Sequence, residues 1–457
     1  MPVNVQPQGA KLENVVMSDS YSSATSSDER KAIYAKVGWR LIPFLFICYT
    51  LNFLDRVNIS FAHLQFQKDI GLSDAAYGLG VGLFFVGYVA LEVPSNLLLK
   101  KMGARLTISR IMILWGLVSS GMMFVRNPVE FYIARALLGI AEGGFFPGIV
   151  LYLTYWFPSA KRARITSRLF LAVAVAGALG GPVSGWILSH MNGVSGMQGW
   201  KWLFLLEGLP SVIVGIVALF YLNDKPADAR WLTSEQREMI ASDIADDEKV
   251  KSDITSSSFG EVLKDPRLYL LAFGYMAVPW SSSVLSFWGP SIIRRAGISN
   301  LADVGLLSAI PYIVGAAFML LVCRNSDRMM ERRWHYGAVA MLTAFGLSLL
   351  PSAASNWVAS IALLSVSNAG FLTAVALFWT IPPAYLSGRA AAGGIGLVSC
   401  IGQSAGLVAP VVFSWGNSLT KSATAGFYLV AMVIVCAGLS IIIGVPARKL
   451  KERRVEV

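Results

Sequence analysis

Two stretches of the sequence place oppositely charged side chains inside segments that are long enough to cross a bilayer. Asp55 and Arg56 are adjacent within an apolar run from about 38 to 64. Arg135 and Glu142 lie seven residues apart within a later apolar run. A charge near a bilayer centre costs about 2.5–3.5 kcal/mol on insertion scales, so such residues face a partner or a water-filled cavity. The pattern predicts a buried cluster of two acids and two arginines.

This cluster suggests a coupling between protons and an organic anion. With all four groups ionised it is neutral, and protonating both acids leaves two uncompensated guanidinium groups. Arginine stays charged and binds a carboxylate through two parallel hydrogen bonds. Protons and an anion should therefore favour each other's binding. We expect Asp55 and Glu142 to carry protons and Arg56 and Arg135 to bind the anion. The alternative is a structural ion-pair network that holds two helices together.

The composition is that of a polytopic membrane protein. Hydrophobic residues make up 55% and charged residues 14%, whereas a soluble domain carries about 25% charged residues. The net charge is +11, and the lysine and arginine residues that produce it lie in loops on one side of the membrane. We therefore expect no nucleic-acid partner. The four cysteines have no pairing or metal-binding spacing, and no catalytic motif is present. We therefore expect no enzyme, no metal site and no cofactor, with the proton as coupling ion.

Apolar stretches of spanning length predict an all-α membrane protein with twelve transmembrane helices in two six-helix bundles. The predicted spans are 38–64, 77–99, 106–125, 130–156, 165–190, 201–222, 268–293, 303–323, 335–352, 357–386, 391–418 and 424–446. Paired six-span halves with a central site are a transporter architecture.

The loops complete the predicted domain organisation. It comprises a disordered cytoplasmic tail (1–36), an N-terminal bundle (37–222), a cytoplasmic linker (223–266), a C-terminal bundle (267–447) and a second tail (448–457). A capping box at Thr233–Gln236 predicts an amphipathic helix in the linker. Lysine and arginine gather in the turns after the second, fourth and eighth spans and in the second tail. This side should be cytoplasmic, with both termini inside.

Weaker candidates for substrate contact are polar or aromatic residues within other spans. Tyr88, Asn368, Ser399 and Gln403 could hydrogen-bond a substrate in a central cavity, and contact between helices is the alternative for each. Trp379 lies well inside its span, so a cavity wall and simple packing both fit its position.

Several motifs carry a resemblance to a known family. They are Phe53-Leu-Asp-Arg-Val-Asn-Ile-Ser60, Arg135-Ala-Leu-Leu-Gly139 followed by Glu142, Trp202-Leu-Phe-Leu-Leu-Glu-Gly208 and Ser326-Asp-Arg328. From Lys36 to Arg448 the chain resembles the major facilitator superfamily, and within it the anion:cation symporter family. The closest likeness is to bacterial tartrate, phthalate and hydroxyphenylacetate permeases.

The resemblance implies roles for individual residues. Asp55 and Glu142 match proton carriers, the two arginines match anion ligands, and Tyr88 matches a tyrosine that contacts substrate. Gln403 stands where the family often has asparagine. The basic turns of the two halves match gating motifs, here Lys100, Arg105, Asp327 and Arg328. Lys100 replaces the usual acid of its turn, whereas Asp327 keeps the equivalent one.

The charged residues and the resemblance together predict a proton-coupled symporter in the lipid bilayer of the inner membrane, and the resemblance implies that it is a monomer. Its substrates would be small organic carboxylates, either aromatic acids such as phthalate or hydroxyphenylacetate, or tartrate-like hydroxy-dicarboxylates. An anion exchanger or facilitator without net proton coupling is one alternative. A membrane sensor of organic acids is another, although the 223–265 loop is short for an output domain.

Overall fold

The computed structural model of the 457-residue chain is all-helical over the residues that it describes. These are residues 27–158, 161–162, 165–166, 169–253, 263–329, 331–382, 389–420 and 424–445. Twelve helical segments within them are long and apolar enough to cross a membrane, which confirms the predicted number of spans.

The chain divides into two compact units, residues 1–43 and 44–457. The described part of the first unit, 27–43, is helical and contains an ion pair between Lys31 and Asp28 at 2.9 Å. Residues 27–36 of the predicted disordered tail are therefore helical, while 1–26 lie outside the described residues, as does the predicted second tail. The predicted bundle and linker boundaries stay predictions.

The first half of the chain contributes six spans. They are formed by α2 (Ser27–Asp69), α3 (Asp74–Met102), α4 (Ala104–Gly121), α5 (Pro128–Glu142) continued by α6 (Phe145–Thr154), α8 (Leu171–His190) and α9 (Gly199–Tyr221). The second half contributes the other six. They are formed by α12 (Pro266–Tyr275) continued by α13 (Ala277–Arg295), α14 (Leu301–Met329), α15 (Arg333–Leu349), α16 (Trp357–Phe378), α18 (Arg389–Thr420) and α19 (Thr424–Gly444).

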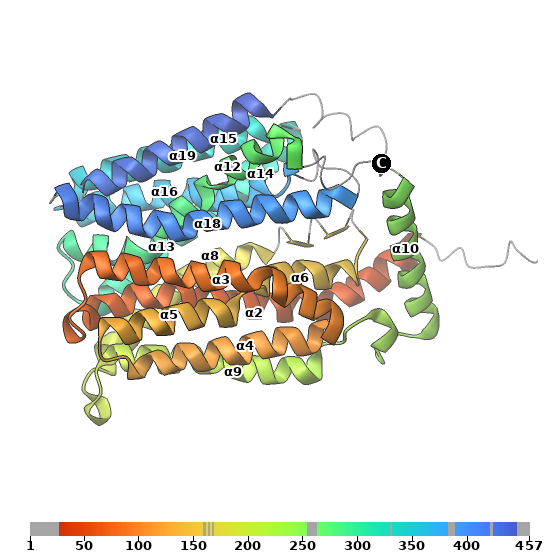
Figure 1. Cartoon of the computed structure of the whole chain (residues 1–457), viewed down its shortest axis with the longest axis horizontal. Helices are drawn as coiled ribbons and strands as arrows, with labels where there is room; N and C mark the ends of the chain where they lie inside the picture. The colour runs from red at the N-terminus through yellow and green to blue at the C-terminus, as the bar shows by residue number, and fades with distance from the viewer. Residues whose placement is uncertain are drawn as a thin grey trace, which may run out of the picture. The chain divides into compact units, whose positions relative to one another are not determined.

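Within residues 44–457 the helices form two bundles. Helices α3 to α9 lie together in one layer and α12 to α19 in the other (Figure 1). Polar caps fix where several helices begin: Ser73, Asn127, Asp265 and Asn356 each accept a hydrogen bond from a backbone N–H in the first turn of the helix that follows. Such caps satisfy donors that have no partner within the helix.

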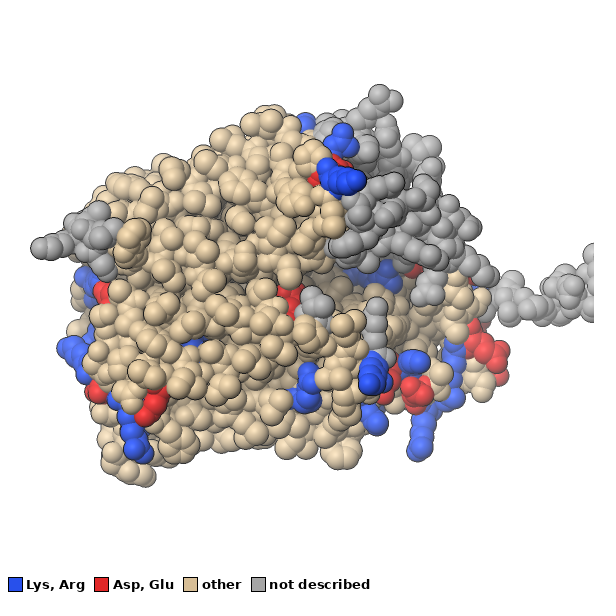
Figure 2. Space-filling view, in the orientation of Figure 1, with Lys and Arg blue, Asp and Glu red and all other residues tan. Residues whose placement is uncertain are grey.

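Charged side chains gather at the two ends of the visible face, and the broad region between them is almost free of charge (Figure 2). Large apolar side chains such as Ile213, Phe220 and Leu306 are exposed on the helices. An exposed apolar belt between charged ends is what a bilayer of about 30 Å hydrocarbon thickness requires.

The linker forms helix α10 (Ser234–Asp253), which runs across one end of the bundles (Figure 1). The predicted capping box is confirmed: Gln236 N–H donates to the Thr233 hydroxyl, and Thr233 N–H donates to the Gln236 side chain, both at 3.3 Å. The Thr233 hydrogen bond also lowers the pKa of the exposed Glu235 carboxyl. Met239 and Ile240 are buried, so this helix is amphipathic as expected.

Hydrogen bonds join the two halves at the end opposite α10. The Tyr77 hydroxyl donates to the Phe287 carbonyl at 3.2 Å, and Arg294 donates to the Leu64 carbonyl at 2.6 Å. Arg295 forms an ion pair with Asp74 at 3.4 Å. These contacts hold the halves together at one end of the membrane.

Candidate functional site

A cavity with about 710 Å³ of empty space lies between the two halves. It is lined by Tyr49, Asn52, Phe53, Arg56, Phe85, Tyr88, Phe146, Phe170 and Val173 from the first half, and by Tyr275, Val278, Pro279, Ser282, Phe371, Val375, Trp379 and Gln403 from the second. Most of these side chains are aromatic. Arg56 is the one charged side chain among the described residues that line the cavity.

The lining residues follow helical faces. Tyr49, Asn52, Phe53 and Arg56 stand at positions i, i+3, i+4 and i+7 of α2, and residues 275, 278, 279 and 282 repeat this spacing at the α12–α13 junction. Residues so spaced share one face of a helix. The sequence reasoning missed all of them except Arg56, although the spacing from Tyr49 to Arg56 was a signal that could have found the α2 face.

Arg56 forms a buried ion pair with Glu142. The Arg56 Nε–H donates to Glu142 Oε1 at 2.7 Å, and its Nη2 contacts the same oxygen. The Glu142 side chain is 1% exposed and the Arg56 side chain 20%, so the arginine is the partner with access to the cavity. Its guanidinium also lies 5.1 Å from the Tyr88 ring centroid, within range for a cation–π interaction.

Glu142 is the last residue of α5, and the fourth span is interrupted directly after it. Gly143 and Gly144 separate α5 from α6, and Gly144 has a φ of +88°, a conformation that favours glycine. A side chain at Gly144 would also meet Ser95 of α3. The sequence predicted one continuous span here, from 130 to 156. The interruption lets α3 approach closely and sets the Glu142 carboxyl at the end of a helix, beside Arg56.

Asp55 forms no ion pair with an arginine in the described structure. Its Oδ1 accepts hydrogen bonds from the Ser119 hydroxyl and from the Asn58 amide, the latter at 2.9 Å, while its buried Oδ2 has no hydrogen-bond partner in the described part of the chain. Asp55 also interacts electrostatically with Glu142 and Arg135. The expected four-charge cluster is thus one direct ion pair with Asp55 and Arg135 nearby.

Arg135 is buried away from the cavity lining. It is 2% exposed, its guanidinium lies 4.8 Å from the Phe84 ring centroid, and its Nε has no hydrogen-bond partner among the described residues. It shares one face of α5 with Glu142, two turns away, as the sequence spacing predicted. In this conformation only Arg56, of the two predicted anion ligands, reaches the cavity.

Three of the five weaker candidates line the Arg56 cavity, and two do not. Tyr88, Trp379 and Gln403 line the cavity together with Arg56. Ser399 is half-buried on α18 and is not among the lining residues. Asn368 is also absent from this cavity.

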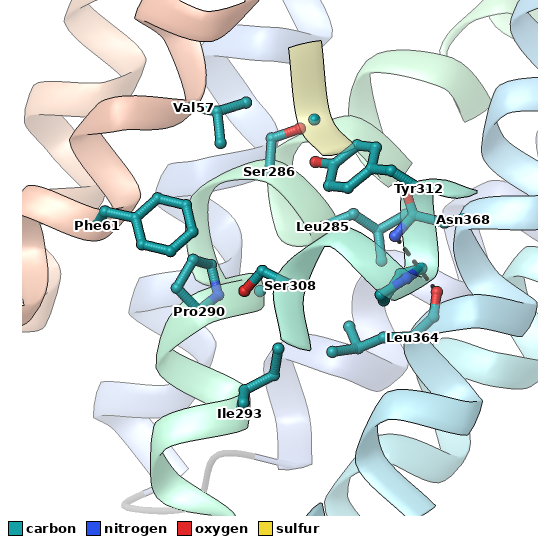
Figure 3. A pocket seen from close by; sticks show the side chains of 13 residues that line it. Val57, Phe61, Leu285, Ser286, Pro290, Ile293, Ser308, Tyr312, Leu364 and Asn368 are labelled. Carbon is teal, nitrogen blue, oxygen red and sulfur yellow. Dashed lines mark hydrogen bonds between the residues drawn. The ribbon is translucent and has the colours of Figure 1, made fainter. Parts of the chain in front are cut away.

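Asn368 instead lines a second, smaller cavity of about 330 Å³, formed by α2, α8, α13, α14 and α16 (Figure 3). Its amide donates to the Leu364 carbonyl of its own helix at 3.3 Å, and its buried Oδ1 accepts no hydrogen bond from any residue that the structure describes. Ser286, Ser308 and Tyr312 add hydroxyl-bearing side chains, and the lining residues other than these three and Asn368 carry no polar side chain. In this conformation Asn368 does not line the Arg56 cavity, because α16 turns residue 368 towards α14, and its contact with substrate stays a prediction.

The predicted gating residues lie at the end that carries α10. Asp327 pairs with Arg332 at 2.5 Å, five residues along the same turn, and Arg328 is exposed. The backbone N–H of Arg105 donates to Asp224 at 2.8 Å. The side chain of Lys100 lies outside the described residues. Their gating role stays a prediction.

Comparisons with known proteins agree with this architecture. The family model for the Major Facilitator Superfamily matches residues 45–410. The chain therefore belongs to the Major Facilitator Superfamily, a family of transporters rather than enzymes.

Individual relatives extend along nearly the whole chain. A putative tartrate transporter of Agrobacterium vitis is 41% identical over 430 residues, covering 94% of this chain and 95% of that protein. The putative metabolite transport protein NicT of Pseudomonas putida is 40% identical over 418 residues, covering 92% and 95%. Both are consistent with the anion:cation symporter resemblance.

A solved structure shows the same fold. The xylose transporter XylE from Escherichia coli, in a partially occluded inward-open conformation, superposes with a TM-score of 0.68. The match covers 89% of this chain and 98% of XylE at 15% identity. The protein is a multi-pass membrane transporter of small molecules.

Proposed function

We propose that this transporter is a proton-coupled symporter that imports small organic carboxylates by alternating access around the Arg56 cavity. The observation that carries the proposal is the buried ion pair of Arg56 with Glu142 at the wall of a cavity lined by both halves. The pair joins a fixed positive charge, which a carboxylate requires, to a group that can take up a proton.

The ion pair gives protons and substrate a common partner. With Glu142 ionised, its Oε1 occupies Arg56 Nε and Nη2, and a substrate carboxylate has to compete for them. With Glu142 protonated, Arg56 is left with an uncompensated charge facing the cavity. A carboxylate then restores neutrality through charge-assisted hydrogen bonds. Proton and anion therefore bind together, and each strengthens the binding of the other by the same factor.

The cavity wall favours aromatic acids within this class. Phe53, Phe85, Tyr275, Phe371 and Trp379 offer ring faces and edges around the single arginine. Aromatic pairs contribute about 0.5–1.5 kcal/mol beyond simple burial. The relative named as a tartrate transporter supports the hydroxy-dicarboxylate alternative. A thermal-shift screen over both series separates them, because a ligand that binds only the folded state raises its stability.

The arrangement of contacts supports alternating access. The hydrogen bonds of Tyr77, Arg294 and Arg295 close the end opposite α10, so exposing the cavity on that side requires these contacts to separate.

We further propose a monomer in the bacterial inner membrane with both termini cytoplasmic. The basic turns at the α10 end support this orientation. A cysteine introduced in the 351–357 turn should react with a membrane-impermeant reagent in intact cells, and one in the 223–253 segment should not. The reverse labelling pattern would overturn the orientation.

The transport activity is tested with purified protein in proteoliposomes. An imposed inward proton gradient should drive accumulation of the best-binding carboxylate, and a protonophore should abolish it. Exchange of labelled for unlabelled substrate without gradient-driven accumulation would make the protein an exchanger. Tight binding without any transport would favour a sensor.

A further inference from the structure

The smaller cavity lies along the same helices as the Arg56 cavity. On α13, Ser282 lines the Arg56 cavity, residues between 285 and 293 line the smaller one, and Arg294 then bonds to the first half. On α2 the lining passes in the same way from Arg56 to Val57. The smaller cavity is therefore placed between the Arg56 cavity and the contacts that close the end opposite α10.

Both halves form the wall of this smaller cavity, and the wall carries no charge. In Figure 3, Val57 and Phe61 of α2 lie on one side of the space and Tyr312 of α14 on the other. A side chain added at Gly289 of α13, which also lines the cavity, would meet no atom within 4 Å, so the space beside this glycine is open. The described lining residues include no acidic or basic side chain. A carboxylate finds no counter-charge here, whereas an uncharged molecule that buries apolar surface is favoured.

Two buried polar atoms in this wall have no hydrogen-bond partner among the described residues. They are Asn368 Oδ1 and Ser286 Oγ, and both residues are 2% exposed. The Tyr312 hydroxyl faces that of Ser286 without a hydrogen bond of normal geometry between them. A buried acceptor without a donor costs free energy, and a ligand that donates to it removes this cost. The cavity therefore suits a ligand with an apolar body and one hydroxyl group.

We propose that the smaller cavity is a second binding site, separate from the Arg56 cavity, for a small uncharged molecule of the phenol class. The ring of the ligand packs against the apolar side chains. Its hydroxyl donates to Asn368 Oδ1 and accepts from the Ser286 hydroxyl. Small-molecule pockets have volumes of about 300–1,000 Å³ and mostly apolar walls with a few polar groups. The smaller cavity, at about 330 Å³, suits a ligand of one ring.

A ligand in this site stabilises the conformation in which the end opposite α10 is closed. It contacts α2 and α8 of the first half and α13, α14 and α16 of the second, so separation of the halves at this end removes part of its contacts. A ligand that binds one conformation more tightly shifts the equilibrium towards it. Phenol should therefore slow transport. This effect rests on the proposed alternating access, whereas the binding itself does not.

The binding test uses phenol, with toluene as a probe of similar size that has no hydroxyl group. Ligand-observed NMR on the purified wild type in detergent should show saturable binding of phenol. Toluene should bind about fivefold more weakly, because it leaves Asn368 Oδ1 without a donor. Gly289→Leu fills the open space beside residue 289 and should abolish saturable binding of both probes. The same variant measures how much of each probe partitions into the detergent.

Three further variants separate the hydrogen bond from general packing. Asn368→Leu keeps the approximate size of the side chain and should remove the preference for phenol over toluene. Ser283→Ala changes a buried α13 hydroxyl that bonds to the Pro279 carbonyl at 2.7 Å and lines neither cavity, so it should leave phenol binding unchanged. Arg56→Ala should also leave phenol binding within about twofold of the wild type, because the sites are separate.

The transport test measures counterflow of a labelled carboxylate in proteoliposomes. Phenol should slow counterflow by the wild type and not by Gly289→Leu, which separates occupation of the site from effects of phenol on the bilayer. Should Gly289→Leu fail to fold or to transport, Asn368→Leu carries the test. It should require about fivefold more phenol for the same inhibition.

The outcomes are distinguishable. Phenol binding that does not saturate, or that is equal in the wild type and in folded Gly289→Leu, overturns the inference. An unchanged preference for phenol in Asn368→Leu overturns the assigned hydrogen bond. Binding that Gly289→Leu abolishes, without any slowing of counterflow, supports the site and overturns its effect on transport. If the wild type carries no carboxylate at all, the proposed function fails, and the binding test still decides whether the site exists.

Discussion

The two halves of this transporter share a fold but bury different polar groups. The described spans of the first half contain buried Asp55, Glu92, Arg135, Glu142 and Glu207. The described spans of the second half bury no aspartate, glutamate, lysine or arginine, and their buried polar residues are serine, threonine and asparagine. The buried acidic and basic side chains thus lie in the first half, and the second half contributes only uncharged side chains to the described cavity wall.

The hydroxyl groups of the second half are mostly satisfied within their own helices. Ser308 donates to the Val304 carbonyl, Thr343 to Val339 and Ser365 to Ile361, each four residues earlier. Such bonds cost little when a helix moves as a rigid body. The Arg56–Glu142 pair also lies entirely within one half. On the proposed mechanism, rocking of the halves would leave this ion pair intact, and protonation of Glu142 would decide whether the charge of Arg56 is compensated.

The largest expected effect comes from removing the charge at the cavity wall. Arg56→Ala should weaken carboxylate binding by about tenfold to hundredfold, because hydrogen bonds to charged groups contribute about 1.5–3 kcal/mol. Arg56→Lys should recover only part of the loss, since the planar fork is missing. Calorimetric titration of the folded variants measures both. If Arg56→Ala binds the carboxylate as tightly as the wild type, the charge of Arg56 does not contribute to substrate recognition.

An uncharged contact from the second half should contribute less to substrate affinity. Gln403 lines the cavity opposite Arg56 and can offer one uncharged hydrogen bond. Gln403→Ala should reduce affinity by about fivefold, as expected for a bond contributing about 1 kcal/mol. The same titration checks this value. A loss as large as that of Arg56→Ala would show that the halves contribute equally and would break the comparison.

The smallest effect is expected at Asn368. It is buried in the second half but lines the smaller cavity and bonds to its own helix. Asn368→Ala should change equilibrium substrate affinity by less than about twofold, because it removes no contact in the Arg56 cavity. Binding measurements on the purified variant test this. A tenfold loss would show that the two cavities act as one substrate site.

The sequence was sufficient for the spans because each apolar stretch is a local signal. It also found Arg56, Tyr88, Trp379 and Gln403, which line one cavity. A charged or polar residue in a membrane span usually faces a partner or a cavity, which is why the sequence could indicate these positions, and their contact with substrate stays a prediction.

Pairwise geometry could not be predicted in the same way. Whether Arg56 would pair with Asp55 or Glu142 depends on side-chain direction and on the break at Gly143 and Gly144, which no periodicity reveals. The cavity that Asn368 lines could not be predicted for a similar reason: its span is apolar on nearly every side, so the sequence does not indicate which face meets which cavity.

The control of Arg56 by Glu142 is tested most directly with Glu142→Gln in proteoliposomes. Glutamine has the shape and charge of the protonated acid, so Arg56 stays available to substrate. Counterflow of labelled against unlabelled carboxylate should persist, and substrate binding should lose part or all of its strengthening at low pH. Accumulation driven by a proton gradient should disappear, because that proton can no longer be taken up and released. Full gradient-driven accumulation by Glu142→Gln would contradict the account and leave Glu142 as a structural partner of Arg56.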